Sequence, residues 1–270
     1  MKLSISQQIE NLEKQEQKFF KRSDSSLIKT TISPVMDKIQ DKIPEKLRSS
    51  LDMAFYKGFQ LVFEKGTAFL EKTYNKERLV MDFDVNNYAI NKDANKRHIK
   101  RLDKRSKQSK LLNSSFSAIE GSVLGLLGIG IPDIPLFLSV IVKTIYEIAL
   151  SYGYPYDTEE EEVFILLLIS ASVSTGKQQL EFDEQLELLG GQIDQNTYVD
   201  VKPDQYMKST SKVLSDALLT TKFIQGIPIV GVVGGAANYS ILNKISQYAC
   251  IKYKKRYLKK KLYNFKDSTI

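Results

Sequence analysis

The chain has 270 residues, of which 42% are hydrophobic, and a formal net charge of +7 at pH 7. Cys250 is its only cysteine and His98 its only histidine, which excludes an intramolecular disulfide and argues against a cysteine-based zinc site or histidine-dependent hydrolytic machinery. The excess positive charge favours a phosphate-rich partner, either an anionic membrane surface or a nucleic acid.

Residues 1–40 are predicted to form an N-terminal helical arm ahead of a helical domain over residues 41–265. Ile5, Ile9 and Leu12 recur at the spacing of one helical face, and we expect the arm to dock loosely or to order on a partner. The first residues lack the apolar core of roughly 7–15 residues that a secretory signal requires. We therefore expect a cytoplasmic protein.

A long helical pattern follows Pro44. Within it Ala54, Gly58, Val62 and Gly66 form a row at a spacing of four, and small residues in such a row allow a second helix to approach closely. The alternative is an ordinary core helix with two tolerated glycines. We favour this alternative.

Residues 96–110 are the most basic run, with eight Lys or Arg residues against one acid, Asp103. A solvated helix face or loop is the favoured interpretation, and a footprint for lipid head groups or nucleic acid is the alternative. The run contains no aromatic residue, whereas proteins that bind single-stranded nucleic acid combine positive charge with aromatic platforms. A nucleic-acid partner is therefore unexpected.

The stretch over residues 120–154 is the most apolar and glycine-rich part of the chain. Residues 123–142 have the length of about 20 residues that a helix needs to span a bilayer. Pro132 and Pro135 interrupt them, because each removes a backbone donor and restricts the residue before it. We expect two helical pieces with a sharp joint, the second over residues 136–151.

Three polar residues in this stretch have competing interpretations. Asp133 precedes the second helix and is expected to cap it, in preference to a catalytic role. Lys143 and Glu147 lie one helical turn apart and form either a surface ion pair or a buried neutralised pair.

After Pro155 the pattern indicates another helix, with Glu159 to Glu162 in its first turn, where the helix dipole favours negative charge. Residues 163–173 are apolar but too short to span a bilayer, so we expect a core helix. Residues 177–210 are polar and mixed, and we expect an insertion or lid with a break at Gly190-Gly191.

A second glycine-rich apolar segment, residues 223–242, repeats the Gly-Ile-Pro motif of residues 130–132 at residues 226–228. We therefore expect an all-α fold, a single helical bundle built around two apolar helical hairpins broken by glycine and proline. A basic helix follows, with an aromatic side that is expected at an interface. The residues expected to contact lipid or a partner are Gly121, Gly125, Gly128, Gly130, Gly226, Gly231, Gly235, Lys252, Lys255 and Arg256.

Several of these motifs, in this order, resemble the EcsC family of bacterial proteins, which is named for its association with an ABC-transporter operon. The residues that carry the resemblance are Glu120, Gly121, Gly125, Gly128, Pro132, Asp133 and Pro135, followed by IYEIALSYGY at 145–154 and GIPIVGVVGGAANY at 226–239. The similarity covers about residues 40–262. It implies an all-helical, membrane-associated protein, and it carries over no reaction and no cofactor.

We expect a non-catalytic protein, peripheral at the inner face of the cell membrane, that binds lipid or a membrane-protein partner such as a transporter. The alternative is a membrane-surface hydrolase that uses Glu120, Asp133 and Glu147 as a buried carboxylate cluster, with Lys143 as a further candidate. Integral insertion of both hairpins is a third interpretation. No cofactor and no metal is expected.

Overall fold

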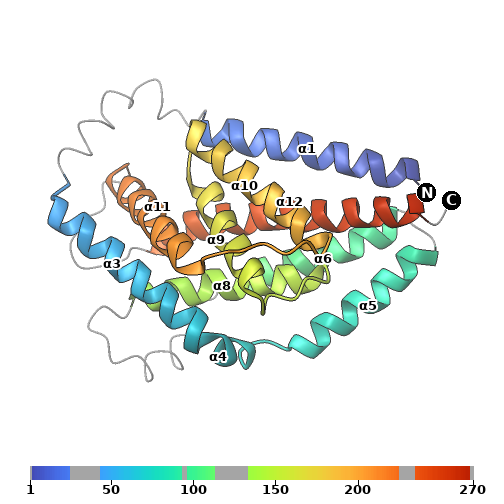
Figure 1. Cartoon of the computed structure of the whole chain (residues 1–270), viewed down its shortest axis with the longest axis horizontal. Helices are drawn as coiled ribbons and strands as arrows, with labels where there is room; N and C mark the ends of the chain where they lie inside the picture. The colour runs from blue at the N-terminus through green and yellow to red at the C-terminus, as the bar shows by residue number, and fades with distance from the viewer. Residues whose placement is uncertain (1, 25–42, 93–95, 113–132, 225–234, 268–270) are drawn as a thin grey trace.

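The computed structural model describes residues 2–24, 43–92, 96–112, 133–224 and 235–267, and over these residues the protein is all-α without a strand (Figure 1). The predicted fold class is confirmed. In chain order the described helices are α1 (Lys2–Asp24), α3 (Glu45–Leu61), the π-helical η1 (Val62–Gly66), α4 (Thr67–Glu71), α5 (Lys76–Lys92), α6 (Lys96–Leu112), α8 (Asp133–Ser151), α9 (Glu159–Val173), α10 (Gly176–Asp194), α11 (Pro203–Ile224) and α12 (Gly235–Asp267).

Two apolar helices, α8 and α9, form the centre of the core. Every residue of α8 from Ile134 to Ser151 is buried, and so is every residue of α9 from Val163 to Val173. A helix that is apolar on all sides is stable in water only when other helices surround it. α8 packs against α3, α5, α6 and α12, and α9 packs against α10, α11 and α12. The predicted core helix over residues 163–173 is confirmed.

α8 is long and apolar enough to cross a membrane, and it is the one helix among the described residues that meets this test. All residues of its apolar window, Ile134–Ser151, are buried inside the protein. Core helices of soluble proteins meet the same test. Packing inside the protein is therefore sufficient to explain the apolar composition of α8. The first half of the broken stretch, up to residue 132, lies outside the described residues.

The two ends of α8 follow from local sequence. It begins at Asp133 with Pro135 in its first turn, where the missing amide has no intrahelical partner to lose. It ends at a turn in which Gly153 has a left-handed φ of 79°, and the amide of Tyr154 donates to the carbonyl of Ala149 at 3.0 Å. Phe83 of α5 packs directly over Gly153, so a side chain there would collide with its ring.

The helix predicted after Pro44 is built from α3, η1 and α4. A Cβ atom at Gly58 would lie 2.8 Å from Leu138 Cδ1 of α8, so this glycine does permit close approach of a second helix. A Cβ atom at Gly66 would meet only atoms of its own helical run. The favoured interpretation of two merely tolerated glycines is therefore wrong at Gly58.

The N-terminal arm is an integral part of the bundle. α1 lies along α12 (Figure 1), and it buries Ile5, Leu12 and Phe19 against the core. The Phe19 ring stacks on Tyr248 of α12 with a centroid separation of 5.1 Å. Loose docking of this arm does not match the structure, because the predicted apolar face extends a further two turns, to Phe19.

The expected insertion over residues 177–210 is wrong. Residues 176–194 form the continuous helix α10, which packs along α9 and shows no break at Gly190-Gly191. A Cβ atom at Gly190 would lie 2.8 Å from the Phe164 ring of α9 and 3.3 Å from Arg256 Cδ of α12. Gly190 therefore allows α10 to pack closely against α9 and α12, a role that its neighbours in the sequence do not reveal.

The aromatic side of the C-terminal helix is also placed differently from the expectation. Tyr248, Tyr253 and Tyr257 of α12 are at most 4% exposed, so they lie in the core and not at an interface. Burying them requires α12 to run through the bundle, with α1 on one side and α8 and α9 on another. Basic residues on neighbouring turns of α12 are buried with them.

Candidate functional site

Four cations on α12 lie on one helical face and point toward α10. Lys252, Lys255, Arg256 and Lys259 follow the spacing of three and four residues that aligns side chains along a helix. Opposite them, α10 presents Asp183, Glu187 and Asp194, which are also aligned by helical spacing. The two rows of opposite charge face each other across the contact between α10 and α12.

Lys252 is the centre of the first half of this network. Its side chain is 2% exposed, and its ammonium pairs with Glu187 at 2.7 Å and also with Asp183 and Glu16 of α1. Burial alone would lower the pKa of Lys252, but attraction to these three carboxylates outweighs it and raises the pKa to about 12. Lys255 joins the same group, at 2.8 Å from Glu16 and 3.0 Å from Glu187.

Glu16, Asp183 and Glu187 are the group among the described residues whose arrangement suits a metal ion. One oxygen atom from each lies within 4.8 Å of the others. The ammonium of Lys252 pairs with all three and supplies the positive charge that a metal would supply. We therefore describe Lys252 and the three carboxylates around it as an ion cluster.

Arg256 is the centre of the second half. Its guanidinium pairs with Glu161 of α9 at 2.8 Å and forms two hydrogen bonds to Asp194, at 2.9 and 3.1 Å. It also lies over the rings of Tyr154 and Phe164, at 4.2 and 4.3 Å from their centroids. Although burial opposes its charge, the two carboxylates hold the pKa of Arg256 above its ordinary value.

Glu161 reaches Arg256 because of its place in α9. Thr158 caps this helix by accepting a hydrogen bond from the Glu161 amide at 3.2 Å. Desolvation raises the pKa of Glu161 above its ordinary value, although the pairing with Arg256 opposes that rise. Glu161, one of the four acids in the run, thus forms a buried ion pair with Arg256. The helix dipole, which explained the acidic run from sequence, did not predict this role.

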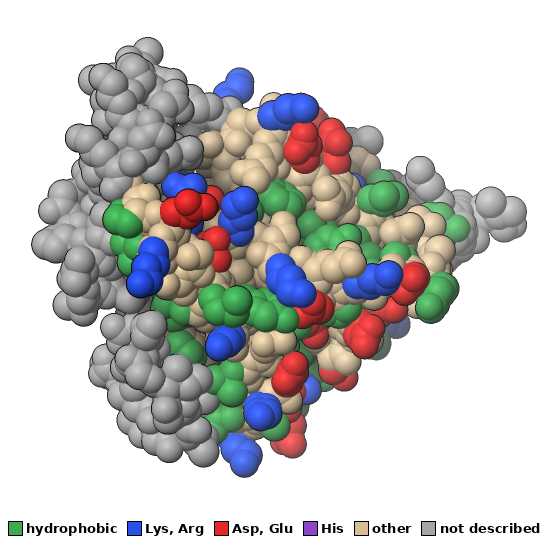
Figure 2. Space-filling view, turned by 60° about the vertical axis from the view of Figure 1, so that its left-hand side comes forward, with side chains coloured by type: hydrophobic (Ala, Val, Ile, Leu, Met, Phe, Trp, Pro, Cys, Tyr) green, Lys and Arg blue, Asp and Glu red, His purple; other side chains and the backbone are tan. Residues whose placement is uncertain are grey.

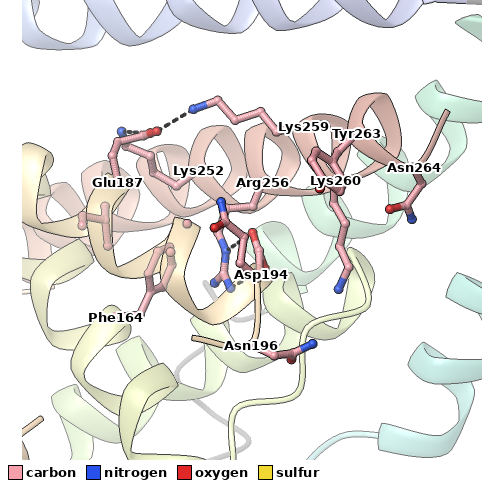
Figure 3. Close-up of a pocket in the computed structure, with 14 residues that line it drawn as sticks. Phe164, Glu187, Asp194, Asn196, Lys252, Arg256, Lys259, Lys260, Tyr263 and Asn264 are labelled. Carbon is pink, nitrogen blue, oxygen red and sulfur yellow. Dashed lines mark hydrogen bonds and ion pairs between the residues drawn. The ribbon is translucent and has the colours of Figure 1, made fainter. Parts of the chain in front are cut away.

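Beside this network lies a groove between α10 and α12 with a volume of about 750 Å³ (Figure 3). Its floor includes Phe164, and Arg256 and Lys260 lie along its α12 wall. Gly190 and Gly191 lie together on the α10 wall. A Cβ atom at Gly191 would have no atom within 4 Å, in contrast to the crowded position of Gly190.

Of the residues predicted to contact lipid or a partner, the structure buries three, places one at the start of α12 and leaves the others outside the described parts of the chain. Lys252, Lys255 and Arg256 are 2–7% exposed, and their charges are neutralised inside the protein. They are therefore not at the surface, where lipid head groups would meet them. Gly235 begins α12. The predicted residues that lie outside the described parts of the chain are Glu120, Gly121, Gly125, Gly128, Gly130, Gly226 and Gly231.

The proposed carboxylate cluster is represented by one described side chain. Glu147 is buried in α8, where its carboxylate lies 3.7 Å from the Lys143 ammonium. This is the buried alternative for the pair. Asp133 begins α8, but its side chain is outside the described set, so its capping role stays a prediction.

The model of the EcsC protein family matches residues 6–258 of the chain. The chain belongs to the EcsC protein family. The match includes most of α1, whereas the resemblance seen in the motifs began near residue 40. No curated protein and no solved structure matches the chain.

A second surface of this EcsC protein combines apolar and basic side chains. On α5, Met81, Val85 and Tyr88 recur along the outer face and are 61–65% exposed. On α6, Ile99 and Leu102 are buried and the exposed face is basic. We call the following set the α5–α6 surface: Met81, Val85, Tyr88, Arg97, Lys100, Arg101 and Lys104.

The two helices of the α5–α6 surface pack against each other and against α8, so their outer faces point away from α8. The described basic side chains of the run, Arg97, Lys100, Arg101 and Lys104, are exposed, which matches the solvated helix face that the sequence favoured. Elsewhere the charges are mixed: on the face shown in Figure 2, Lys and Arg alternate with Asp and Glu among the described residues. The basic face of α6 differs from that pattern.

Glu162 of the same EcsC protein supports a prediction about pH. Burial, with repulsion from Glu159 and Glu64, raises its pKa to about 7. A carboxyl group whose pKa is higher in the folded state than in the unfolded state binds its proton more tightly when the protein is folded. The free energy of unfolding of the wild type therefore falls as pH rises from about 4.5 to about 7. Glu162→Gln should therefore be about 1–3 kcal/mol more stable than the wild type at pH 8 and about equal at pH 4.5, measured by urea unfolding.

The matched control is Glu184→Gln, which removes one exposed carboxylate from α10. Equal stability differences for Glu162→Gln at both pH values would contradict the assignment of the raised pKa to Glu162.

Proposed function

We propose that this EcsC family member is a non-catalytic, cytoplasmic protein that binds peripherally to the anionic inner face of the cell membrane. The observation that carries the proposal is the α5–α6 surface. Contiguous exposed apolar side chains on a soluble protein face are typical of an interaction site, and adjacent basic residues attract anionic head groups. The net charge of +7 acts in the same direction.

The partner that fits this surface best is a lipid bilayer. Met81, Val85 and Tyr88 are long or aromatic side chains that enter the boundary between head groups and acyl chains. Each Lys or Arg close to an anionic membrane contributes about 1 kcal/mol to binding. The glycine-rich segments before α8 and α12 are proposed as further contacts to lipid or to a membrane-protein partner.

Vesicle flotation tests the proposal. The wild type should float with vesicles that contain phosphatidylglycerol and should bind less to vesicles of neutral phosphatidylcholine. Lys100→Gln/Arg101→Gln/Lys104→Gln should weaken binding to the anionic vesicles by about tenfold to a hundredfold, because three attractive charges are lost. Met81→Ser/Val85→Ser/Tyr88→Ser should weaken binding to both kinds of vesicle.

The matched control is Lys177→Gln/Lys202→Gln/Lys212→Gln, which removes the same charge from exposed positions on α10, α11 and the loop between them. If this control loses as much binding as the α6 variant, general charge and not the α5–α6 surface is responsible. If the wild type floats with neither kind of vesicle, the proposal fails, and a protein partner becomes the occupant to test.

A further inference from the structure

The groove between α10 and α12 has the properties of a small-molecule site. Its volume of about 750 Å³ lies inside the range of roughly 300–1,000 Å³ that is usual for ligand pockets. Apolar groups, Phe164 and Leu186, line one part, and the α12 side chains Arg256, Lys259 and Lys260 line another. None of these residues belongs to the α5–α6 surface.

The α12 wall of the groove attracts negative charge. Burial would raise the pKa of Glu187, but Lys252, Lys259 and Lys255 outweigh burial and hold that pKa well below its ordinary range. This carboxylate and Asp194 are already hydrogen-bonded to α12 cations. Lys252 also pairs with Glu16 and Asp183, and Arg256 also pairs with Glu161. Among the described residues, the positive charge of the wall that no carboxylate neutralises is therefore that of Lys260.

Lys260 supplies that remaining charge at the mouth of the groove. Its side chain is exposed, and no carboxylate of the described residues lies within ion-pair distance of its ammonium. In Figure 3 it extends from α12 toward the loop that carries Asn196. Asn196, with a left-handed φ of 52°, places an amide on the opposite side of the mouth.

Arg256 contributes a donor that lacks an acceptor. The side chain is 8% exposed, and its Nε and Nη2 atoms are occupied by Asp194 and Glu161. Its Nη1 atom is buried and has no hydrogen-bond partner among the described residues. An unsatisfied buried donor carries a cost in free energy, and an acceptor brought by a ligand would remove it.

From this arrangement we infer that the groove binds a phosphate ester. The phosphate group accepts hydrogen bonds from Lys259, Lys260 and Arg256 Nη1, and the organic part of the ester lies between the exposed ring of Tyr263 and the open space beside Gly191. A phosphate group has several anionic oxygens that can accept from a cluster of Lys and Arg donors at once, which a single carboxylate does less well. The ester is either a soluble metabolite or a lipid head group.

Gly191 offers a way to fill the groove without disturbing its walls. Because a Cβ atom there meets nothing within 4 Å, Gly191→Leu places its side chain in open space. Gly191→Ala is the matched control, since it makes the same change to helix propensity and leaves the groove open. The neighbouring Gly190 is unsuitable, because a side chain there would strike Phe164 and Arg256.

Isothermal titration calorimetry with glycerol 3-phosphate tests the soluble arm, with glycerol as the uncharged comparison. The wild type and Gly191→Ala should bind glycerol 3-phosphate and not glycerol. Gly191→Leu and Lys260→Gln should each weaken binding by about tenfold or more, since one loses the space and the other loses a charge-assisted hydrogen bond.

The lipid arm uses flotation with phosphatidylglycerol vesicles. If glycerol 3-phosphate does not bind but Gly191→Leu lowers vesicle binding relative to Gly191→Ala, the ester is a lipid head group. Binding of glycerol 3-phosphate by a protein that does not float supports the groove and refutes only the membrane proposal. If Gly191→Leu changes neither measurement, the inference is overturned.

Discussion

Lys252→Met should destabilise the protein by about 3–5 kcal/mol at pH 7.5, because removing one partner of a buried ion pair leaves uncompensated charge in the interior. Here Glu16, Asp183 and Glu187 all lose this partner. Lys255 and Lys259 still pair with Glu16 and Glu187, so the cluster is left with one uncompensated negative charge. The same cluster joins α1, α10 and α12, so its loss weakens the attachment of α1. Urea unfolding followed by circular dichroism measures the effect.

The pH dependence separates this mechanism from a simple packing defect. Lys252 makes the largest contribution to holding the pKa of Glu187 low, so without it the pKa of Glu187 in the folded state rises. The folded variant then binds protons more readily than the folded wild type, so its deficit should shrink as pH falls from 7.5 toward 4.5. A deficit of equal size at both pH values would point to lost packing instead.

Lys259→Met is the matched control for this prediction. It removes the same charge from the same helix and from one of the same carboxylates, Glu187, but its side chain is 49% exposed. Pairs of this kind contribute about 0–1 kcal/mol. A loss as large as that of Lys252→Met would show that general charge, and not burial, decides the effect.

The elements that the sequence predicted well are those whose pattern depends on one helix alone. The core helix over residues 163–173 is apolar on every face, and the second half of the broken stretch has proline at its start and glycine just beyond its end. Such signals are local, and neither requires knowledge of a neighbour. The all-α class follows from them together with the absence of alternating strand patterns.

The errors concern residues whose role depends on a second helix. Gly190 resembled a break, and only the closeness of Phe164 and Arg256 shows that it serves packing. Lys252 and Arg256 were predicted to contact lipid or a partner, since a row of basic residues is usually exposed. Their burial depends on carboxylates far away in the chain, on α1, α9 and α10.

A usable signal for the network was nevertheless present. Asp183, Glu187 and Asp194 share one face of α10, and Lys252 and Arg256 share one face of α12. Two complementary rows of charge on separate helices indicate a possible pairing. Sequence spacing could not show that the pairing is buried or that a groove lies beside it, because both depend on how closely the helices approach.

Arg256→Met should also lower the free energy of unfolding by about 3–5 kcal/mol at pH 7.5. A second substitution can isolate the cause. Glu161 is 3% exposed and would remain in the core with its cation removed. Its pKa, already raised by burial, would rise further, so the variant should recover stability as pH falls toward 5. Adding Glu161→Gln removes the uncompensated charge and should restore much of the loss at pH 7.5.

Urea unfolding of the wild type, both single variants and the double variant forms a cycle that gives the coupling energy of the pair. A coupling near zero would mean that Arg256 stabilises the fold through Tyr154, Phe164 and Asp194, and that the buried charge of Glu161 is tolerated without it.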